Sequence, residues 1–380
     1  MVSRGPNALP ALLHLWIRAL CSRGTTTVRA FGMLQGDSEM SEGVHGEFDV
    51  DIQLTSLVSH QKHNLQVFWR DEEEATRFHA PFTAETSFAF SPEETSAQYK
   101  IQIGGFHGPV IWAPHILACQ TPPERQMPAV LTVLSHSFSE INDLADMELF
   151  VQVLVEHVTH HKKLGLVGTA HYEVEPYLSY MANHSAVQAL VEQGSLRLIR
   201  WDMQVQLEDA FGFLLQGRTW HVERSKVLQF NHAILAHWGL DAYLNTMDND
   251  EFMGTNEATN VSVMLANGCI VPQGNTNDMR YDIRCGGCTG TETDLWKAPG
   301  QHNHLRLYNE TDFRVRLRGK PILYADASFS SSIHESGVFH EGREDMSSCF
   351  YHLHMVNLFS PRRNASDHEF TSDTSWQWIL

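Results

Sequence analysis

Apolar and polar residues alternate with period two in several short runs between residues 47 and 122. The clearest runs cover residues 65–69 and 99–103, and Gly- and Pro-containing turn signals separate them. Alternation of this kind is typical of strands that have one buried face. We therefore predict a small β-rich domain, sandwich-like in architecture, over residues 47–122.

The pattern changes after Pro122-Pro123. From residue 127 onward, short apolar runs typical of buried strands alternate with longer runs in which apolar residues recur at helical spacing. The predicted helices cover residues 142–163, 185–193 and 221–238. This alternation is typical of α/β proteins, so we predict an open mixed sheet with helices on both faces.

Three further segments lack both patterns. Residues 254–318 are rich in Gly, Asn and Cys, and we expect an irregular insertion there, either a substrate-binding excursion or a tolerated one. Residues 366–380 are expected to form a polar tail. Residues 1–35 hold four Arg, no acidic residue and an apolar run too short to span a membrane. We expect a targeting or disordered segment there, at most a weak anchor, followed by a linker at 36–46.

The identity of that N-terminal segment stays open among a signal peptide, a signal anchor, an organellar transit sequence and a mis-assigned start.

The composition of the whole chain narrows the class of protein. The chain has 380 residues, 42% of them hydrophobic, with nine Trp, which favours globular domains over disorder. The net charge of −18 disfavours nucleic acid as a partner but is compatible with neutral substrates such as sugars.

The cysteines and glycosylation sequons bear on the compartment. Cys285 and Cys288 are half of a zinc site, a redox pair or disulfide partners, and no second ligand pair at zinc-like spacing accompanies them. Disulfides, to Cys269 or within a loop, require an oxidising compartment. Four Asn-x-Ser/Thr sequons would carry glycans in the secretory path, at Asn183, Asn260, Asn309 and Asn364.

The strongest chemical signal is the acidic stretch Asp248-Asn249-Asp250-Glu251, which directly follows a strand-like run at residues 242–247. Carboxylate oxygens so placed suit Mg²⁺ or Mn²⁺, especially when substrate phosphates complete the coordination shell. Ligands of open α/β sheets bind at the carboxyl ends of strands. A second Asp-x-Asp, Asp49 and Asp51, alternates with apolar residues, so we interpret it as the polar face of a strand.

Further motifs occur in a fixed order around this stretch. They are Glu156-His157 with Lys163-Leu164-Gly165, Tyr172 or Tyr177, Gly194 and Trp201, Gln229 with Asn231-His232, Trp238, Asp248 to Phe252, Lys320, His334, and His352 with His354. In this order, from about residue 127 to 363, the chain resembles glycosyltransferase family 92. It departs from the family at Asn249, where an aliphatic residue is usual, and over the segment 254–318.

The resemblance implies a GT-A-like glycosyltransferase domain over residues 127–365. It also implies a divalent metal, Mn²⁺ or Mg²⁺, a UDP-sugar donor with galactose as first guess, and transfer with inversion to a glycan or glycoprotein acceptor. The implied location is the Golgi or another secretory lumen, with an organellar or cytosolic location as the alternative. A cation there would neutralise the charge that develops on the diphosphate leaving group.

Site residues follow from the same resemblance. Asp250 is expected to bind the metal directly, Asp248 to bind it through water or to hold the ribose, and His334 to be the remaining protein ligand. Donor contacts are expected from Lys320, Gln229 and Asn231, with His352 and His354 as further candidates. An inverting enzyme needs a carboxylate base. Glu292 and Asp294 are candidates because they lie near Trp296, which could stack on a sugar ring.

One alternative function stays open. The chain could be a catalytically degenerate carbohydrate-binding or scaffold protein with a transferase-like domain, and the irregular segment 254–318 favours that interpretation. A metallohydrolase would need clustered His motifs, such as His-Glu-x-x-His, which the sequence lacks.

Overall fold

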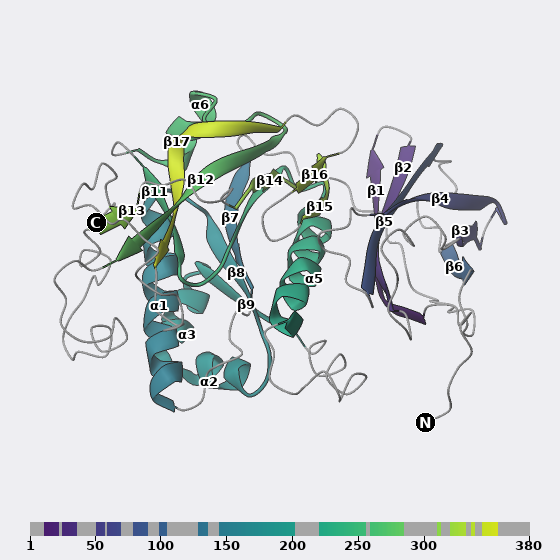
Figure 1. Ribbon diagram of the computed structural model, residues 1–380. Helices are drawn as coiled ribbons and strands as arrows, with labels where there is room; N and C mark the ends of the chain where they lie inside the picture. Colours follow the sequence, from purple (N-terminus) through teal and green to yellow (C-terminus); the bar gives the residue numbers. More distant parts are fainter. Residues whose placement is uncertain are drawn as a thin grey trace. The chain divides into compact units, whose positions relative to one another are not determined.

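The computed structural model divides the chain into two compact units (Figure 1). The first unit holds Met1–Gln126 together with Asn231–Asp241, and the second holds Met127–Phe230 and Ala242–Leu380. The structure describes residues 11–22, 25–35, 51–57, 59–69, 79–89, 99–104, 128–135, 144–201, 220–255, 259–284, 310–312, 320–331, 336–338 and 344–355.

The first unit is built on one six-stranded antiparallel sheet, in the order β1-β2-β5-β4-β3-β6. In its described part it is therefore a single sheet and not the two stacked sheets of the predicted sandwich. Apolar side chains of one face form its core, among them Val28, Ile52 and Phe82. The strands are β1 (Ala11–Ser22), β2 (Thr25–Gln35), β3 (Asp51–Ser56), β4 (Lys62–Trp69), β5 (His79–Ala89) and β6 (Tyr99–Gly104).

The alternation along β3 agrees with its sequence pattern. Asp51 is exposed, whereas Ile52 and Leu54 are fully buried. The strand pairs with β4 on one side and β6 on the other, so its apolar residues face the core of the unit. The interpretation of Asp51 as part of a polar strand face is confirmed, while Asp49 lies outside the described residues.

The expectation of a targeting or disordered segment over residues 1–35 is wrong for residues 11–22 and 25–35, which form β1 and β2. These two strands pair along their whole length, and β2 pairs in turn with β5. Arg29, one of the Arg residues that suggested targeting, is buried against Glu85, with Nε 2.8 Å from Oε2. Its charge is used inside the fold, and so the composition of this segment gave a misleading signal.

The second half of helix α5 (Trp220–His237) also belongs to the first unit. Leu235 and Trp238 pack against Leu20 of β1. The guanidinium carbon of Arg29 lies 4.4 Å from the ring centre of Trp238, a cation–π contact. The end of α5 is therefore buried within the first unit, and its beginning belongs to the second.

The second unit is organised by a nine-stranded mixed sheet, in the order β11-β17-β12-β14-β10-β7-β8-β9, with β13 paired to β12. Strands β10, β7, β8 and β9 are parallel to their neighbours in this row. The other strands bring antiparallel pairs, such as β10 with β14. The strands include β7 (Ala129–Leu134), β8 (Gly168–Glu173), β9 (Leu196–Arg200), β10 (Ala242–Met247), β11 (Glu251–Thr255), β12 (Asn275–Arg284), β13 (Glu310–Asp312), β14 (Ile322–Tyr324) and β17 (Glu344–Met355).

Helices connect the parallel strands, as the sequence pattern predicts. All six residues of β10 are buried, which shows that both faces of the sheet are covered there. In Figure 1, α1 and the first half of α5 flank these strands from opposite sides. The other helices are α1 (Leu144–Lys163), α2 (Tyr177–Asn183), α3 (Ser185–Glu192) and α6 (Val261–Ala266), and β15 (Ser328–Ser331) pairs with β16 (Ser336–Val338). The coarse prediction of a mixed α/β unit preceded by a β-rich unit is confirmed.

The expected irregular insertion at 254–318 is wrong for residues 259–284. They form α6 and β12, and β12 lies inside the sheet between β17 and β14. Its buried residues are largely polar, and Asn275, for example, accepts hydrogen bonds from the Tyr324 N–H at 2.9 Å and the Ser328 hydroxyl at 2.8 Å. Because polar residues occupy its buried positions, hydropathy could not reveal this strand.

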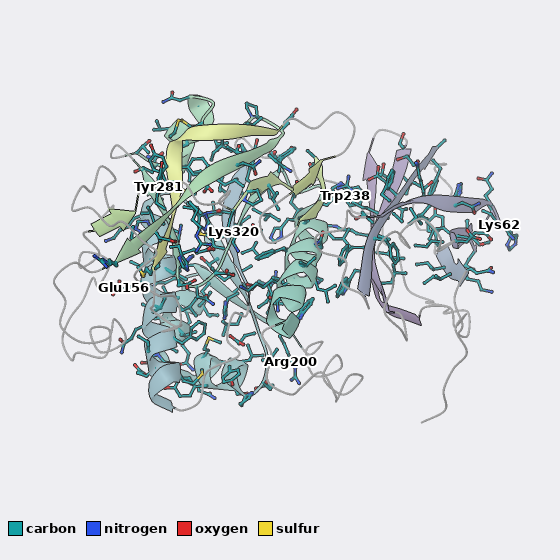
Figure 2. The ribbon with its side chains drawn as sticks, viewed as in Figure 1. Lys62, Glu156, Arg200, Trp238, Tyr281 and Lys320 are labelled. Atoms are coloured by element: carbon teal, nitrogen blue, oxygen red, sulfur yellow. A yellow bond between two sulfur atoms is a disulfide. The ribbon has the colours of Figure 1, made fainter. Side chains whose placement is uncertain are left out.

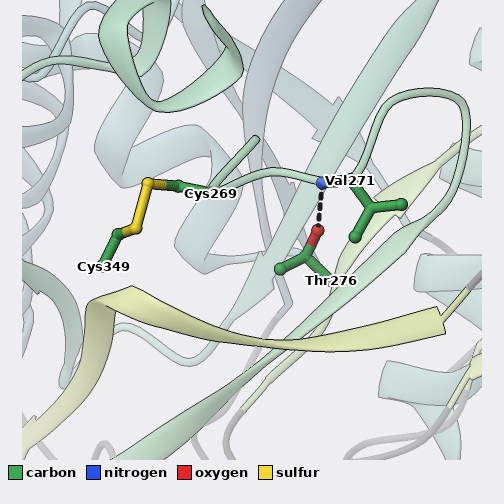
Figure 3. Close-up of a disulfide and its surroundings, with 4 residues drawn as sticks. All are labelled: Cys269, Val271, Thr276 and Cys349. Carbon is green, nitrogen blue, oxygen red and sulfur yellow. Dashed lines mark hydrogen bonds between the residues drawn. A yellow bond between two sulfur atoms is a disulfide. The ribbon is translucent and has the colours of Figure 1, made fainter. Parts of the chain in front are cut away.

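A disulfide joins Cys269, just after α6, to Cys349 of β17 (Figure 3). Next to it, the Val271 N–H donates to the Thr276 hydroxyl at 2.8 Å and fixes the turn into β12. Cys285 lies outside the described residues, as does Cys288. Among the described helices, none is both long and apolar enough to cross a membrane.

Candidate functional site

The acidic stretch lies where the strand order of the second unit reverses. The chain passes from β7 to β8 and β9 on one side, then returns to place β10 on the other side of β7. Strands β7 and β10 pair in parallel and end side by side, at Leu134 and Met247. Just beyond these ends, the Ser135 hydroxyl donates to Asp248 Oδ1 at 3.3 Å. The Asn249 amide also donates to the Ser135 carbonyl at 3.2 Å. Such reversal points form the ligand crevice of open α/β sheets.

A tight turn holds the four residues of the stretch. The Glu251 N–H donates to the Asp248 carbonyl at 3.1 Å, and the Asp248 N–H donates back to Glu251 Oε2 at 2.8 Å. Glu251 is buried and starts β11, while the side chains of Asp248 and Asp250 are 16% and 23% exposed. The turn therefore directs Glu251 inward and leaves the two aspartates nearer to solvent.

Two lysines neutralise Asp248. Lys226 Nζ lies 2.8 Å from Oδ1, and Lys320 Nζ lies 3.2 Å from Oδ2. Burial alone would raise the pKa of Asp248, but the two ammonium groups outweigh burial and hold that pKa well below its usual range. Figure 2 shows Lys320 in the interior of the second unit, where it also lies 3.6 Å from Glu251 Oε2.

His352 joins the turn to β12. Its Nε2 lies 3.1 Å from Glu251 Oε2, and its Nδ1 lies 3.2 Å from Asp278 Oδ2. Burial opposes the charged form, yet Asp278 and Glu251 outweigh it and raise the pKa of His352 to about 9. At neutral pH the imidazole is therefore a cation between two buried carboxyl groups.

His354 occupies the same face of β17 two residues later. Its Nε2 lies 3.4 Å from Asp250 Oδ2, and its Nδ1 lies 2.8 Å from Asp282 Oδ1. Arg280 lies between these groups, with guanidinium nitrogens 3.3 Å from Asp282 Oδ1 and 3.8 Å from Glu251 Oε1. Both candidate histidines thus contact carboxylates of the acidic turn, His352 that of Glu251 and His354 that of Asp250.

The remaining expected residues have different placements. Lys320 is at the turn, but its side chain is only 1% exposed. Gln229 is buried on α5, one helical turn after Lys226, and buried Asn231 belongs to the first unit. The expected ligand His334 and the expected acceptor-site residues all lie outside the described residues, namely Glu292, Asp294 and Trp296.

Sequence reasoning missed four residues of the site: Lys226, Asp278, Arg280 and Asp282. The last three occur at i, i+2 and i+4 of one segment, a period-two signal that predicts a strand with one charged face. Lys226 gave a weaker signal, a single charge directly before the buried residues Val227 and Leu228 of α5.

The carboxylates of the turn fit a divalent ion only if a bound ligand supplies further oxygen atoms to it. Both oxygens of Asp248 already face ammonium groups, which leaves Asp250 as the more accessible carboxylate of the turn. Within the described ranges, no group of three His, Cys, Asp or Glu side chains is arranged to hold a metal by itself. A hard cation at Asp250 would need further oxygens, such as those of a bound diphosphate.

Neither a protein-family model nor a curated protein matches this chain.

Proposed function

We propose that the chain is a metal-dependent glycosyltransferase with a GT-A-like second unit, which transfers a hexose from a UDP-sugar to a glycan acceptor with inversion. Galactose is the first choice for the sugar. The observation that carries the proposal is the position of the Asp248–Glu251 turn at the strand-order reversal between β7 and β10. A nucleotide bound in that crevice would place its phosphates beside this turn.

The charges around the turn support a phosphate ligand. Lys226, Lys320 and Arg280 bring three basic side chains to the turn, each in contact with a carboxylate, in a chain whose net charge is −18. Such cations counter the negative charge of a diphosphate as it leaves. An anionic donor could bind at these basic side chains, and a neutral glycan is compatible with the acidic character of the rest of the chain.

Asp250 would hold the metal, and the bound ion would supply charge neutralisation of the diphosphate. The residues of this chain position that ligand. The Glu251 carboxylate accepts the backbone N–H of Asp248 and so fixes its position. His354 contacts Asp250 through one ring nitrogen and Asp282 through the other. The two aspartates are thereby oriented before a ligand arrives, which lowers the cost of binding.

The proposed location is the Golgi or another secretory lumen. The Cys269–Cys349 disulfide supports it, because such bonds persist in oxidising compartments. Asn183 supports it as well, since this sequon is exposed at the end of α2. Expression in a secretory host should give a mass that falls after treatment with an N-glycan-cleaving enzyme. A single unmodified mass would argue for a different compartment.

The proposed activity is tested by measuring hydrolysis of a panel of nucleotide sugars by the full chain with and without Mn²⁺. We expect one UDP-hexose to be hydrolysed only with the metal, and Asp250→Asn to abolish this hydrolysis. Asp51→Asn is the matched control, since Asp51 is exposed at the start of β3, in the other unit. If no donor is hydrolysed and Mn²⁺ with UDP gives no thermal shift, the domain is a degenerate scaffold.

A further inference from the structure

Lys226 is a cation at the site that no sequence pattern assigned to a function. It comes from α5, and its ammonium lies 2.8 Å from Asp248 Oδ1. Burial would lower the pKa of Lys226, but Asp248 outweighs burial and raises it, so the group is fully charged at neutral pH. A buried charge of this kind is retained only when a partner compensates for its lost hydration.

The two lysines at Asp248 differ in access to solvent. The Lys226 side chain is 11% exposed, whereas that of Lys320 is 1% exposed and lies between Asp248 and Glu251. Lys320 is therefore an internal counter-ion for two carboxylates. Lys226 is the more exposed of the two lysines at Asp248.

Asp248 itself is poorly suited to a divalent cation. Each of its oxygens faces an ammonium group, at 2.8 and 3.2 Å. A metal ion bound to either oxygen would lie close to two positive charges, which repel it. Among the described residues, the close contact of the neighbouring Asp250 side chain is with the imidazole of His354, and the cations Lys226 and Arg280 act on it from longer range. A metal ion is therefore less strongly repelled at Asp250.

We propose that Asp248 anchors Lys226 and is not a metal ligand, and that Lys226 contacts the diphosphate of the donor. This inference rests on the proposed function and assigns its anion-binding residue. A lysine ammonium has three N–H groups, so the one directed to Asp248 leaves two for phosphate oxygens. Anchored in this way, Lys226 loses less side-chain entropy on binding than a free surface lysine.

The test is calorimetric titration of the full chain with UDP, at several Mn²⁺ concentrations, for the wild type and four variants. Lys226→Met removes the charge and keeps the length of the side chain. Asp248→Asn removes the anchor, and Asp250→Asn removes the proposed metal ligand. The double variant Lys226→Met/Asp248→Asn measures whether the two residues act as a unit. Thermal midpoints of all variants check that each chain is folded.

We expect Lys226→Met and Asp248→Asn each to weaken UDP binding by about 10- to 100-fold, and the double variant to be no weaker than the worse single variant. Their UDP affinity should still increase with Mn²⁺. Asp250→Asn should bind UDP with no dependence on Mn²⁺. If Lys226→Met does not fold, Lys226→Gln replaces it, and weaker binding of UDP with unchanged affinity for uridine supports the proposal.

Two outcomes overturn this inference alone, namely unchanged UDP affinity in a folded Lys226 variant or loss of the Mn²⁺ dependence in Asp248→Asn. A wild-type chain that binds no UDP with Mn²⁺ overturns the proposed function, and this inference with it. The two failures are therefore distinguishable from the wild-type titration.

Discussion

The Nε2 atom of His352 lies 3.1 Å from Oε2 of Glu251, and both side chains are buried. The same Glu251 oxygen accepts the Asp248 N–H, so one carboxylate links β17 to the turn at the end of β10. Through its other ring nitrogen His352 continues to Asp278 of β12. The geometry of the turn therefore depends on two strands that lie about 30 and 100 residues further along the chain.

The first prediction concerns Glu251→Gln, which removes a charge and keeps the shape. We expect a loss of about 3–5 kcal/mol in the free energy of unfolding, because His352 and Lys320 would lose a buried counter-charge. Urea denaturation at pH 7 measures it. Asp250→Asn is the matched control, and its more exposed carboxylate should cost much less. Equal small losses in both variants would show that Glu251 does not organise the turn.

The second prediction concerns the buried histidines of α1. Burial, and then the neighbouring His160, lower the pKa of His157 from 6.5 to about 3, and burial also lowers the pKa of His161. Below pH 6.5 the unfolded chain binds more protons than the folded one, because its histidines keep their ordinary pKa. The stability of the folded state is therefore unaffected by these groups above pH 6.5 and decreases as the pH falls toward 3. At pH 5.5 His157 alone should cost about 1.4 kcal/mol, and His161 should act in the same direction.

This acid sensitivity is measured by urea denaturation at pH 7.5 and 5.5. His157→Met removes one titrating group and keeps an apolar contact with Phe252, whose ring centre lies 4.9 Å from that of His157. We expect the drop between the two pH values to be smaller in this variant by about 1.4 kcal/mol. An unchanged drop would mean that His157 does not titrate as a buried neutral group.

The third prediction concerns the Cys269–Cys349 disulfide, which closes a loop of 80 residues. Chain-entropy arguments give about 4.5 kcal/mol of stabilisation for a loop of this length. The double variant Cys269→Ser/Cys349→Ser should lose an amount of this order in urea denaturation. Wild-type protein with a reducing agent should match it. Alkylation of Cys269 in unreduced, denatured protein would contradict the pairing.

Local patterns in the sequence determined the parallel core of the second unit and its acidic turn. Buried strands and amphipathic helices have characteristic periods, so the elements near residues 130, 150 and 245 could be predicted within a few residues. The position of Asp248 and Asp250 after an apolar strand also followed from neighbouring residues alone. The period of a segment is a local property, and one sequence is enough to measure it.

The tertiary structure alone decided the rest of the site. Strand β12 has polar buried residues, because partners such as Ser328 and His352 satisfy them from 50 to 75 positions away. Lys226 and Lys320 converge on Asp248 from a helix and a strand edge that are 94 positions apart, and only the fold makes them neighbours. Burial and the charged partners together then set the pKa values of Asp248 and Lys226. Long-range contacts and desolvation are properties of the folded chain, and no local pattern contains them.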